Sequence, residues 1–203
     1  QRQMCIRDSH YLDSDVMSAF LAIYVDINER TELSFGARYT EEEKTGIIKI
    51  PYIHAAAAAF GFGAPPLIEG LEFEDDNLSP EVALNYYIND DTSVYIAYKK
   101  AFKSGGIDNS ALPTASINPL SPSFTGFDSL IYDSEEADGF EIGLKSNLMD
   151  GNMRLNATYY KYEYTDLQVQ LFDAAIIQFS TFNDGAVESE GFEADVLWYT
   201  EIP

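Results

Sequence analysis

Two histidines and one cysteine are the residues of this 203-residue chain whose types most readily support catalysis or metal binding. His10 and His54 are far apart in the sequence, and Cys5 has no second cysteine with which to form a disulfide. A zinc site needs several such ligands, and a catalytic triad needs a nucleophile beside a histidine. The sequence therefore predicts no catalytic centre, no resident metal and no cofactor.

Acidic residues dominate the charge of the chain, with 34 Asp and Glu against 12 Lys and Arg and a formal net charge of −22. This charge argues against binding to nucleic acid, because proteins bind its phosphates with Lys and Arg. Three acidic runs, at residues 41–43, 72–76 and 135–138, offer carboxylates of the kind that bind a hard cation such as Ca²⁺. Such runs are more often solvated loops, and the sequence leaves both interpretations open.

The first nine residues, QRQMCIRDS, differ in character from the rest of the chain. They contain neither an apolar segment nor a cleavage site, so they do not have the features of a signal peptide. The string resembles translated adapter sequence at the ends of assembled environmental reads. We expect residues 1–9 to be a non-native or disordered lead-in and residues 10–203 to form one partial domain; a native disordered lead-in is the alternative.

Apolar and polar residues alternate with a period of two along seven segments, which is the pattern of strands with one apolar face. Phe140 and Ile142, for example, are separated by Glu141 and followed by Gly143. No apolar run reaches the length of about eighteen residues that a transmembrane helix requires. The segments expected to be strands are residues 18–27, 31–44, 79–88, 93–103, 136–148, 153–171 and 186–199.

The connections between these segments are alternately short and long. Turn-forming residues fill the short ones, at 28–30, 89–91 and 149–152. The long ones cover residues 45–78, 104–135 and 172–185. In an antiparallel meander this arrangement places all short turns at one end of the sheet and all long loops at the other, as in outer-membrane barrels.

The apolar face of such strands meets either a protein core, as in a β-sandwich, or membrane lipid, as in a transmembrane barrel. Two features favour lipid: the strands exceed the usual length of about five or six residues, and aromatic residues gather towards the long-loop ends. We expect these side chains to face lipid: Leu33, Phe35, Leu84, Phe140, Ile142, Leu144, Leu155, Phe192, Val196 and Trp198. We expect these to face the barrel lumen: Arg38, Glu81, Asn85, Glu141, Lys145, Arg154, Glu193 and Asp195.

Three stretches, at residues 78–108, 135–172 and 182–198, resemble successive strands of TonB-dependent outer-membrane receptors. The stretch SFGARYTEEEK, at residues 34–44, resembles the strand that precedes them. The order and spacing of these stretches are similar to the family over nearly all of the chain after residue 11. The resemblance implies an all-β fold, part of a large antiparallel transmembrane β-barrel, without the plug domain that fills such barrels.

The resemblance also implies a function. Members of the family import scarce ligands across the bacterial outer membrane, driven by the TonB complex acting through the plug. We therefore expect active uptake, with a ferric siderophore or a similar ligand as cargo, and with outer-membrane lipid and the TonB complex as partners. Ligand contacts are expected on the long loops and strand tips, at Tyr52, His54, Phe60, Phe102, Lys103, Asp108, Asn109 and Phe127, with Phe62, Phe124, Phe172, Phe179 and Phe182 as further candidates.

Two other functions remain open from the sequence. A passive porin would share the barrel wall but would lack a plug domain upstream. A secreted β-sandwich, for example a carbohydrate-binding module, would share the alternation but would bury its apolar face beneath a second sheet. The surroundings of Phe140, Ile142, Leu155 and Val196 distinguish the sandwich from the barrel.

Overall fold

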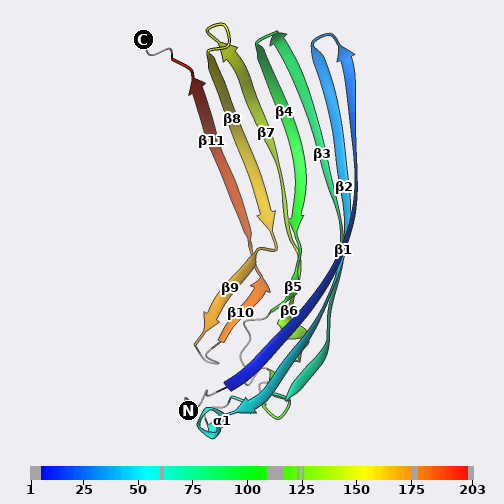
Figure 1. Ribbon diagram of the computed structural model, residues 1–203, viewed down its shortest axis with the longest axis vertical. Helices are drawn as coiled ribbons and strands as arrows, with labels where there is room; N and C mark the ends of the chain where they lie inside the picture. The colour runs from blue at the N-terminus through cyan, green and yellow to red at the C-terminus, as the bar shows by residue number, and fades with distance from the viewer. Residues whose placement is uncertain are drawn as a thin grey trace.

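Seven long strands form one antiparallel sheet in the order β1-β2-β3-β4-β7-β8-β11. They lie side by side along the length of the molecule, with the short turns at one end and the loops at the other (Figure 1). The strands of this sheet are β1 (Ile6–Asn28), β2 (Thr31–Ile53), β3 (Leu67–Asn89), β4 (Thr92–Lys103), β7 (Glu135–Leu148), β8 (Met153–Thr165) and β11 (Ala186–Trp198). The computed structural model describes residues 6–59, 62–108, 117–122, 124, 126–174 and 178–200.

The long connections contain the smaller elements. They are α1 (Ala55–Ala59), η2 (Asp128–Leu130) and two short antiparallel pairs, β5 (Gly106–Ile107) with β6 (Ile131–Tyr132) and β9 (Gln168–Asp173) with β10 (Gln178–Asn183). Among the residues that the structure describes, no helix has the length and apolar character needed to cross a membrane.

The predicted seven-strand meander, with short turns at one end and long loops at the other, is confirmed. The predicted bounds of three strands are too short. β1 begins at Ile6, β2 continues to Ile53 and β3 begins at Leu67, so most of the expected link at 45–78 is strand. Strand pairing continues into this region: Glu43 pairs with both Asp15 of β1 and Glu74 of β3.

The expected lead-in overlaps β1, in which Ser9 pairs with Lys49. Residues 1–5 lie outside the described part of the chain. Backbone pairing does not show whether residues 1–9 belong to the native sequence. Their non-native origin therefore stays a prediction.

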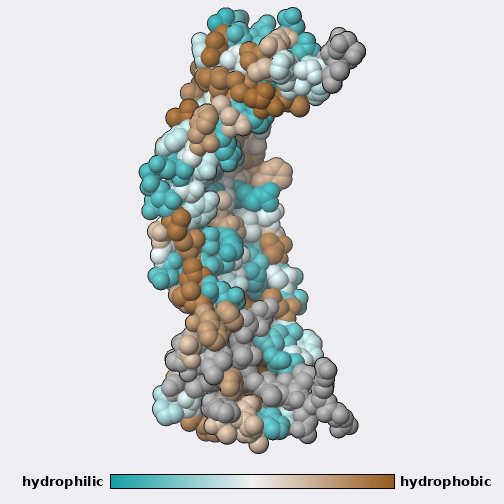
Figure 2. Space-filling model, turned by 90° about the vertical axis from the view of Figure 1, so that its left-hand side faces the viewer, coloured by the Kyte–Doolittle hydropathy of each residue, from teal (hydrophilic) through white to brown (hydrophobic). Residues whose placement is uncertain are grey.

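The strand register assigns every side chain of the sheet to one of two faces. We call inner the face that carries the even-numbered residues of β2, from Glu32 to Ile50, and outer the opposite face. Near the short turns the outer face is apolar, and Figure 2 shows hydrophobic surface gathered below the turns on the β11 side. One outer row crosses all seven strands through Val25, Leu33, Leu84, Ile96, Ile142, Tyr159 and Phe192.

Towards the long-loop end the two faces exchange their character. After Tyr39, the outer side chains of β2 are Glu41 and Glu43, both exposed. The inner side chains of the same strand, Ile48 and Ile50, are only 2% and 3% exposed. They belong to a buried cluster because described residues of the segment 104–134 pack over the inner face there; the cluster consists of Ile48, Ile50, Ile68, Leu71, Ile107, Ile117 and Leu130.

A bulge in β3 keeps its apolar side chains on the inner face. Gly46 pairs with Leu71 whereas Ile48 pairs with Ile68, so β3 has one more residue than β2 between these pairs. Gly70 accommodates the bulge with a φ of 74°, a left-handed conformation that glycine adopts without steric cost. Ile68 and Leu71 are therefore both buried, although their spacing departs from strict alternation.

Candidate functional site at the long-loop end

Lys44 of β2 holds the start of segment 104–134 against the inner face. Its Nζ donates to Ser104 Oγ at 2.8 Å and to the carbonyl oxygen of Gly105 at 2.6 Å, and it lies 3.1 Å from the carboxylate of Glu42. Burial alone would raise the pKa of Glu42, but hydrogen bonds with Ser104 and Lys44 and the charge of Lys44 lower it. Glu42 is therefore an ionised partner of Lys44 at neutral pH.

The β9–β10 hairpin follows β8 after a kink. β8 ends at Thr165 and β9 begins at Gln168, and the strand expected over 153–171 is interrupted between them. At the kink, Asp166 lies between β8 and β9, and Gly185 lies between β10 and β11; their φ values are 53° and 74°. Such left-handed backbone turns a strand sharply, so the hairpin leaves the direction of β8 and β11 (Figure 1).

Two amide side chains of the hairpin tie it to the segment 104–134. The amide of Gln168 donates to the carbonyl oxygens of Ser104 at 2.9 Å and Asp133 at 3.1 Å. Asn183 accepts from the backbone N–H of Asp133 at 2.7 Å and donates to its carbonyl oxygen at 2.8 Å. These bonds satisfy backbone groups that have no strand partner, and they fix the hairpin relative to the loop.

A polar cavity of about 300 Å³ lies among these elements. Asp108 is buried beside it, and its carboxylate accepts the backbone N–H of Thr181 at 2.8 Å. Burial, followed by the charge of Asp108, raises the pKa of the Tyr132 phenol, which is therefore neutral at physiological pH. The cavity is lined by Leu12, Lys44, Gly106, Ile107, Asp108, Tyr132, Gln170 and Thr181.

The structure brings only some of the expected ligand contacts to this cavity. Asp108 lines it, whereas the ammonium of Lys103 lies 3.5 Å from the carboxylate of Glu135. Phe127 packs against the buried cluster, and its ring centroid is 5.5 Å from that of Phe124. These two phenylalanines therefore help to hold segment 104–134 in place.

Three other expected contacts, Tyr52, His54 and Phe102, are not among the residues that line the cavity. His54 accepts the backbone N–H of Ala56 at 3.1 Å, which makes it a cap of α1, and its ring is 6.4 Å from that of Tyr52. Phe102 is on the outer face of β4, where it pairs with Glu136. Phe60 and Asn109 lie outside the described residues.

An aromatic pair lies on the same side of the hairpin as two of the cavity residues. Phe172 pairs with Phe179 across the hairpin, and their ring centroids are 5.1 Å apart. Gln170 pairs with Thr181 two positions along, so all four side chains share one face. Both phenylalanines are half exposed, which leaves apolar surface next to the polar cavity.

The cavity contains residues that the sequence did not single out, namely Lys44, Tyr132, Gln170 and Thr181. A local signal existed for one of them: Gln168 and Gln170 alternate with Val169 and Leu171, which places both glutamines on one face of a strand. Lys44 carried no such signal, because its role depends on a loop sixty residues away in the chain.

The wall that supports this site has the two faces that the sequence predicts. All residues expected to face lipid lie on the outer face, and all those expected to face the lumen lie on the inner face. Phe140, Ile142 and Val196 are 36%, 48% and 57% exposed, so no described segment of the chain covers them. The solvent that each face meets stays a prediction at this point.

Inner-face side chains near the middle of the wall form a polar network. Glu141 accepts a hydrogen bond from the phenol of Tyr162 at 2.6 Å and one from Lys99 at 3.4 Å. Tyr95 bonds with Thr158 at 3.1 Å, and its ring fills the space beside its cross-strand partner Gly143, where a Cβ atom would overlap it. The network gives this part of the inner face an ordered, polar surface.

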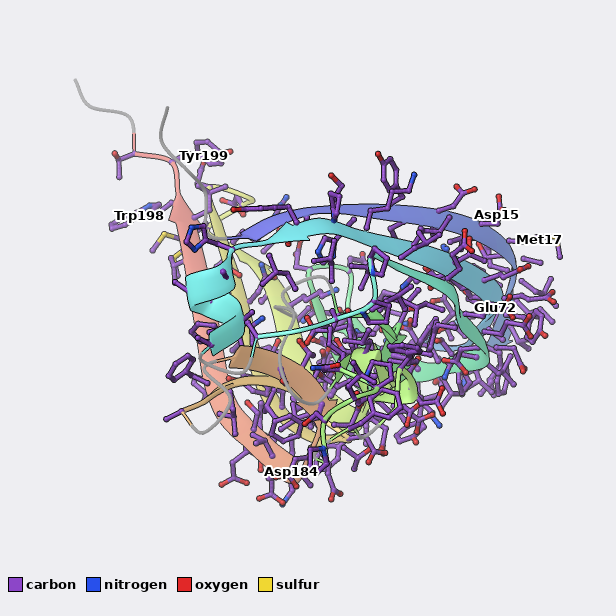
Figure 3. All side chains as sticks on the ribbon, turned by 90° about the horizontal axis from the view of Figure 1, so that it is seen from below. Asp15, Met17, Glu72, Asp184, Trp198 and Tyr199 are labelled. Carbon is purple, nitrogen blue, oxygen red and sulfur yellow. The ribbon has the colours of Figure 1, made fainter. Side chains whose placement is uncertain are left out.

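The acidic runs do not form a metal site among the described residues, since no three His, Cys, Asp or Glu side chains converge there. The runs at 41–43 and 72–76 lie in strands β2 and β3 rather than in loops. Figure 3 looks along the strands and shows Asp15 and Glu72 at the outer edge of the curved sheet, away from the loops that the sheet partly encloses.

Comparison with known proteins identifies the family. Residues 6–201 match the family described as TonB dependent receptor-like, beta-barrel. No curated protein matches the chain.

Several solved structures share the fold. The ferric yersiniabactin uptake receptor FyuA from Yersinia pestis matches 95% of this chain with 25% of its own, at a TM-score of 0.70 and 17% identity. The ferric-catecholate import receptor Fiu from E. coli K12 matches 92% of this chain with 26% of its own, at a TM-score of 0.63 and 16% identity. The ferripyoverdine receptor of the outer membrane of Pseudomonas aeruginosa matches 97% of this chain with 22% of its own, at a TM-score of 0.57 and 17% identity.

The chain therefore spans about a quarter of the length of the receptors that it matches. Its open seven-stranded sheet is a portion of their antiparallel transmembrane barrel, as the sequence predicted. Because the family match covers nearly the whole chain, this protein belongs to the TonB-dependent receptor β-barrel family.

Proposed function

We propose that this chain forms part of the wall and mouth of an outer-membrane receptor that imports a ferric siderophore, or a similar scarce ligand, in a TonB-dependent manner. The observation that carries the proposal is the family match over residues 6–201. The family consists of transport receptors, so we expect binding and translocation rather than catalysis.

The apolar band on the outer face has a direct role in this proposal. Side chains such as Ile142 and Val196, half exposed in the isolated chain, would be costly in water, at about 25 cal/mol for each Å² of apolar surface. Against lipid this cost vanishes, and a strand of about ten residues suffices to cross the hydrocarbon layer. We therefore assign the outer band to lipid and the inner polar network to the lumen.

The inner face next to the short turns has the character of a docking surface for the plug. A cleft of about 480 Å³ there includes Asp91, Lys145, Arg154 and Asn156. Neither Lys145 nor Arg154 lies within salt-bridge distance of a carboxylate among the described residues. In the proposed receptor these cations face the plug domain, which fills the lumen and connects the barrel to the TonB complex.

The test requires the full-length gene that contains this segment. The encoded receptor should be expressed in a Gram-negative strain without ferric receptors of its own, with and without a working TonB complex, and uptake of radioactive iron from ferric siderophores should be measured. We expect uptake only when TonB is present. Equal uptake in both strains, or an upstream sequence without a plug domain, would contradict the proposal.

The two alternatives fare differently. A passive porin stays an alternative, and TonB-independent diffusion in the same assay would support it. The β-sandwich is wrong, because the chain has the fold of the barrel receptors and its apolar face is not covered by a second sheet among the described residues.

A further inference from the structure

A groove of about 380 Å³ lies on the outer face of β1, β2, β3 and β4, close to the level at which this face changes from apolar to acidic. Ala37 and Pro80, which pair across β2 and β3, contribute only short side chains to it. The longer side chains of Leu21, Phe35 and Tyr98 stand around them and are exposed. The groove is lined almost entirely by apolar atoms, so it suits an apolar ligand.

The groove lies where the pairing of two strands ends. The ladder between β3 and β4 ends at Glu81 and Lys99, and the next residue of β3, Pro80, has no backbone N–H to donate. From there towards the long loops β3 remains paired with β2. The hollow is therefore set by the course of the backbone as well as by the short side chains.

Carboxylates cover the same face directly beyond the groove. Glu41 pairs with Asp76, and Glu43 pairs with both Asp15 and Glu74; all five are exposed. In the part of the chain that the structure describes, no Lys or Arg lies within salt-bridge distance of them. Like charges directly opposite one another destabilise a sheet, so a partner that brings positive charge would relieve this repulsion.

One lipid molecule is long enough to reach both features. Glu41 lies about 13 Å along β2 from Ala37, at a rise of about 3.3 Å per residue. Because barrel strands are tilted by about 45°, this distance corresponds to about 9 Å in depth. The hydrocarbon of one leaflet is about 15 Å deep, half of the full layer, so a headgroup beside Glu41 places an acyl chain at the groove.

From this arrangement we infer that the groove holds an acyl chain of a phospholipid whose headgroup carries an ammonium group, such as phosphatidylethanolamine. The acyl chain fills the hollow between Leu21, Phe35 and Tyr98, and the ammonium lies against Glu41 and Asp76. The inference rests on the part of the proposed function that places the outer face against lipid, and it does not depend on the cargo.

Two other occupants fit this surface less well. A second copy of the chain, docked by the same face about a two-fold axis along the membrane normal, would bring its own acidic rows against these and increase the repulsion. An anionic lipid bridged through a divalent cation would need converging carboxylates, and no three converge among the residues with described positions.

The first experiment compares two lipids on the full-length receptor in detergent, with bound lipid measured by native mass spectrometry. Phosphatidylethanolamine and phosphatidylglycerol with identical acyl chains differ only in the headgroup, which is zwitterionic in the former and anionic in the latter. We expect phosphatidylethanolamine to bind more tightly, by on the order of tenfold. Equal affinities, or a preference for phosphatidylglycerol with or without added Mg²⁺, would overturn the inference.

Two pairs of variants locate the binding. Ala37→Trp fills the groove with an apolar ring and should weaken the binding of both lipids severalfold; Ala194→Trp makes the same substitution on the outer face of β11 and is the matched control. Glu41→Lys should remove the preference for phosphatidylethanolamine. Glu29→Lys makes the same change of charge in the turn at the opposite end of the sheet and should preserve it.

The outcomes separate the lipid site from the uptake function. An equal effect of the two Trp variants, or of the two Lys variants, would overturn the inference. If Ala37→Trp does not assemble, the comparison of headgroups on the unmodified receptor still decides. TonB-dependent iron uptake without any lipid preference would count against the groove alone, whereas the expected lipid binding without iron uptake would contradict the proposed cargo and support the lipid site.

Discussion

The short-turn half and the long-loop half of the sheet differ in which face carries the apolar side chains. In the short-turn half, Phe35 and Ile142 of the outer face are exposed, and Glu141 of the inner face is hydrogen-bonded. In the long-loop half, Glu43 is exposed on the outer face and Ile48 is buried on the inner face. The strand β2 continues without a break from one half to the other, but the side that is apolar changes.

This difference shows that amphipathic alternation in a strand reports the surroundings of each face and not merely the strand itself. A face in contact with lipid must be apolar, whereas beyond the membrane the same face meets water and the opposite face can support a packed loop. In the receptor that we propose, the change at Tyr39 of β2 and Leu78 of β3 would mark the level at which these strands leave the lipid.

The largest expected effect comes from opening the inner cluster of the long-loop half. Leu130 is 2% exposed, and Leu130→Ala should reduce the free energy that holds segment 104–134 on the wall by about 2–5 kcal/mol. Faster amide hydrogen exchange at residues 105–108 and 128–132 of the full-length receptor would report this. Leu120→Ala is the control, because Leu120 is 93% exposed; an equal change in both variants would refute the inner packing.

A smaller effect is expected from placing a charge on the outer face of the short-turn half. Ile142→Lys should reduce the folding free energy of the full-length receptor in lipid bilayers by about 2–4 kcal/mol, because its ammonium would meet hydrocarbon. Denaturant titration in vesicles measures this. Glu43→Lys introduces the same side chain on the same face in the other half and should have little effect. If the two variants behave alike, the outer face does not change solvent between the halves.

The smallest effect is a response to pH at the contact between Lys44 and segment 104–134. The lowered pKa of Glu42 means that its ionised form stabilises the folded state above the ordinary value of 4.5, and that this contribution is lost as the pH falls below it. Hydrogen-exchange protection factors at residues 104–106 should therefore be constant near neutral pH and decrease as the pH falls below about 4.5. The decrease should be absent in Glu42→Gln, and its persistence there would exclude Glu42 as the cause.

Much of the fold was predictable because strand alternation and turn composition are local signals. Residues as far apart as Leu33 and Phe192 were assigned to the same face correctly, since each lies in a strand with a clear period of two. The extension of β2 was missed for a physical reason: residues 40–45 are all polar, so the alternation disappears where the apolar side changes. Only the pairing with β1 and β3 shows that the strand continues.

The candidate site was predictable only in part. Asp108 was expected, since polar residues on long loops often contact ligands, but Lys44, Gln170 and Thr181 come from separate elements that meet only in the folded chain. His54 caps α1, and a histidine that caps a short helix has no sequence signature distinct from a ligand contact; its expected role in ligand binding stays a prediction.

The kink before the β9–β10 hairpin constrains how this loop can change in evolution. Thr165 pairs with Ala186 on one side of the kink and Gln168 with Asn183 on the other, so each strand omits the same number of residues. Inserting a single residue after Thr165 would move each side chain of β9 to the opposite face of the hairpin. Gln170 would then point away from the cavity. Related receptors that keep this mouth should therefore differ there by even numbers of residues, or carry a compensating change on the opposite strand.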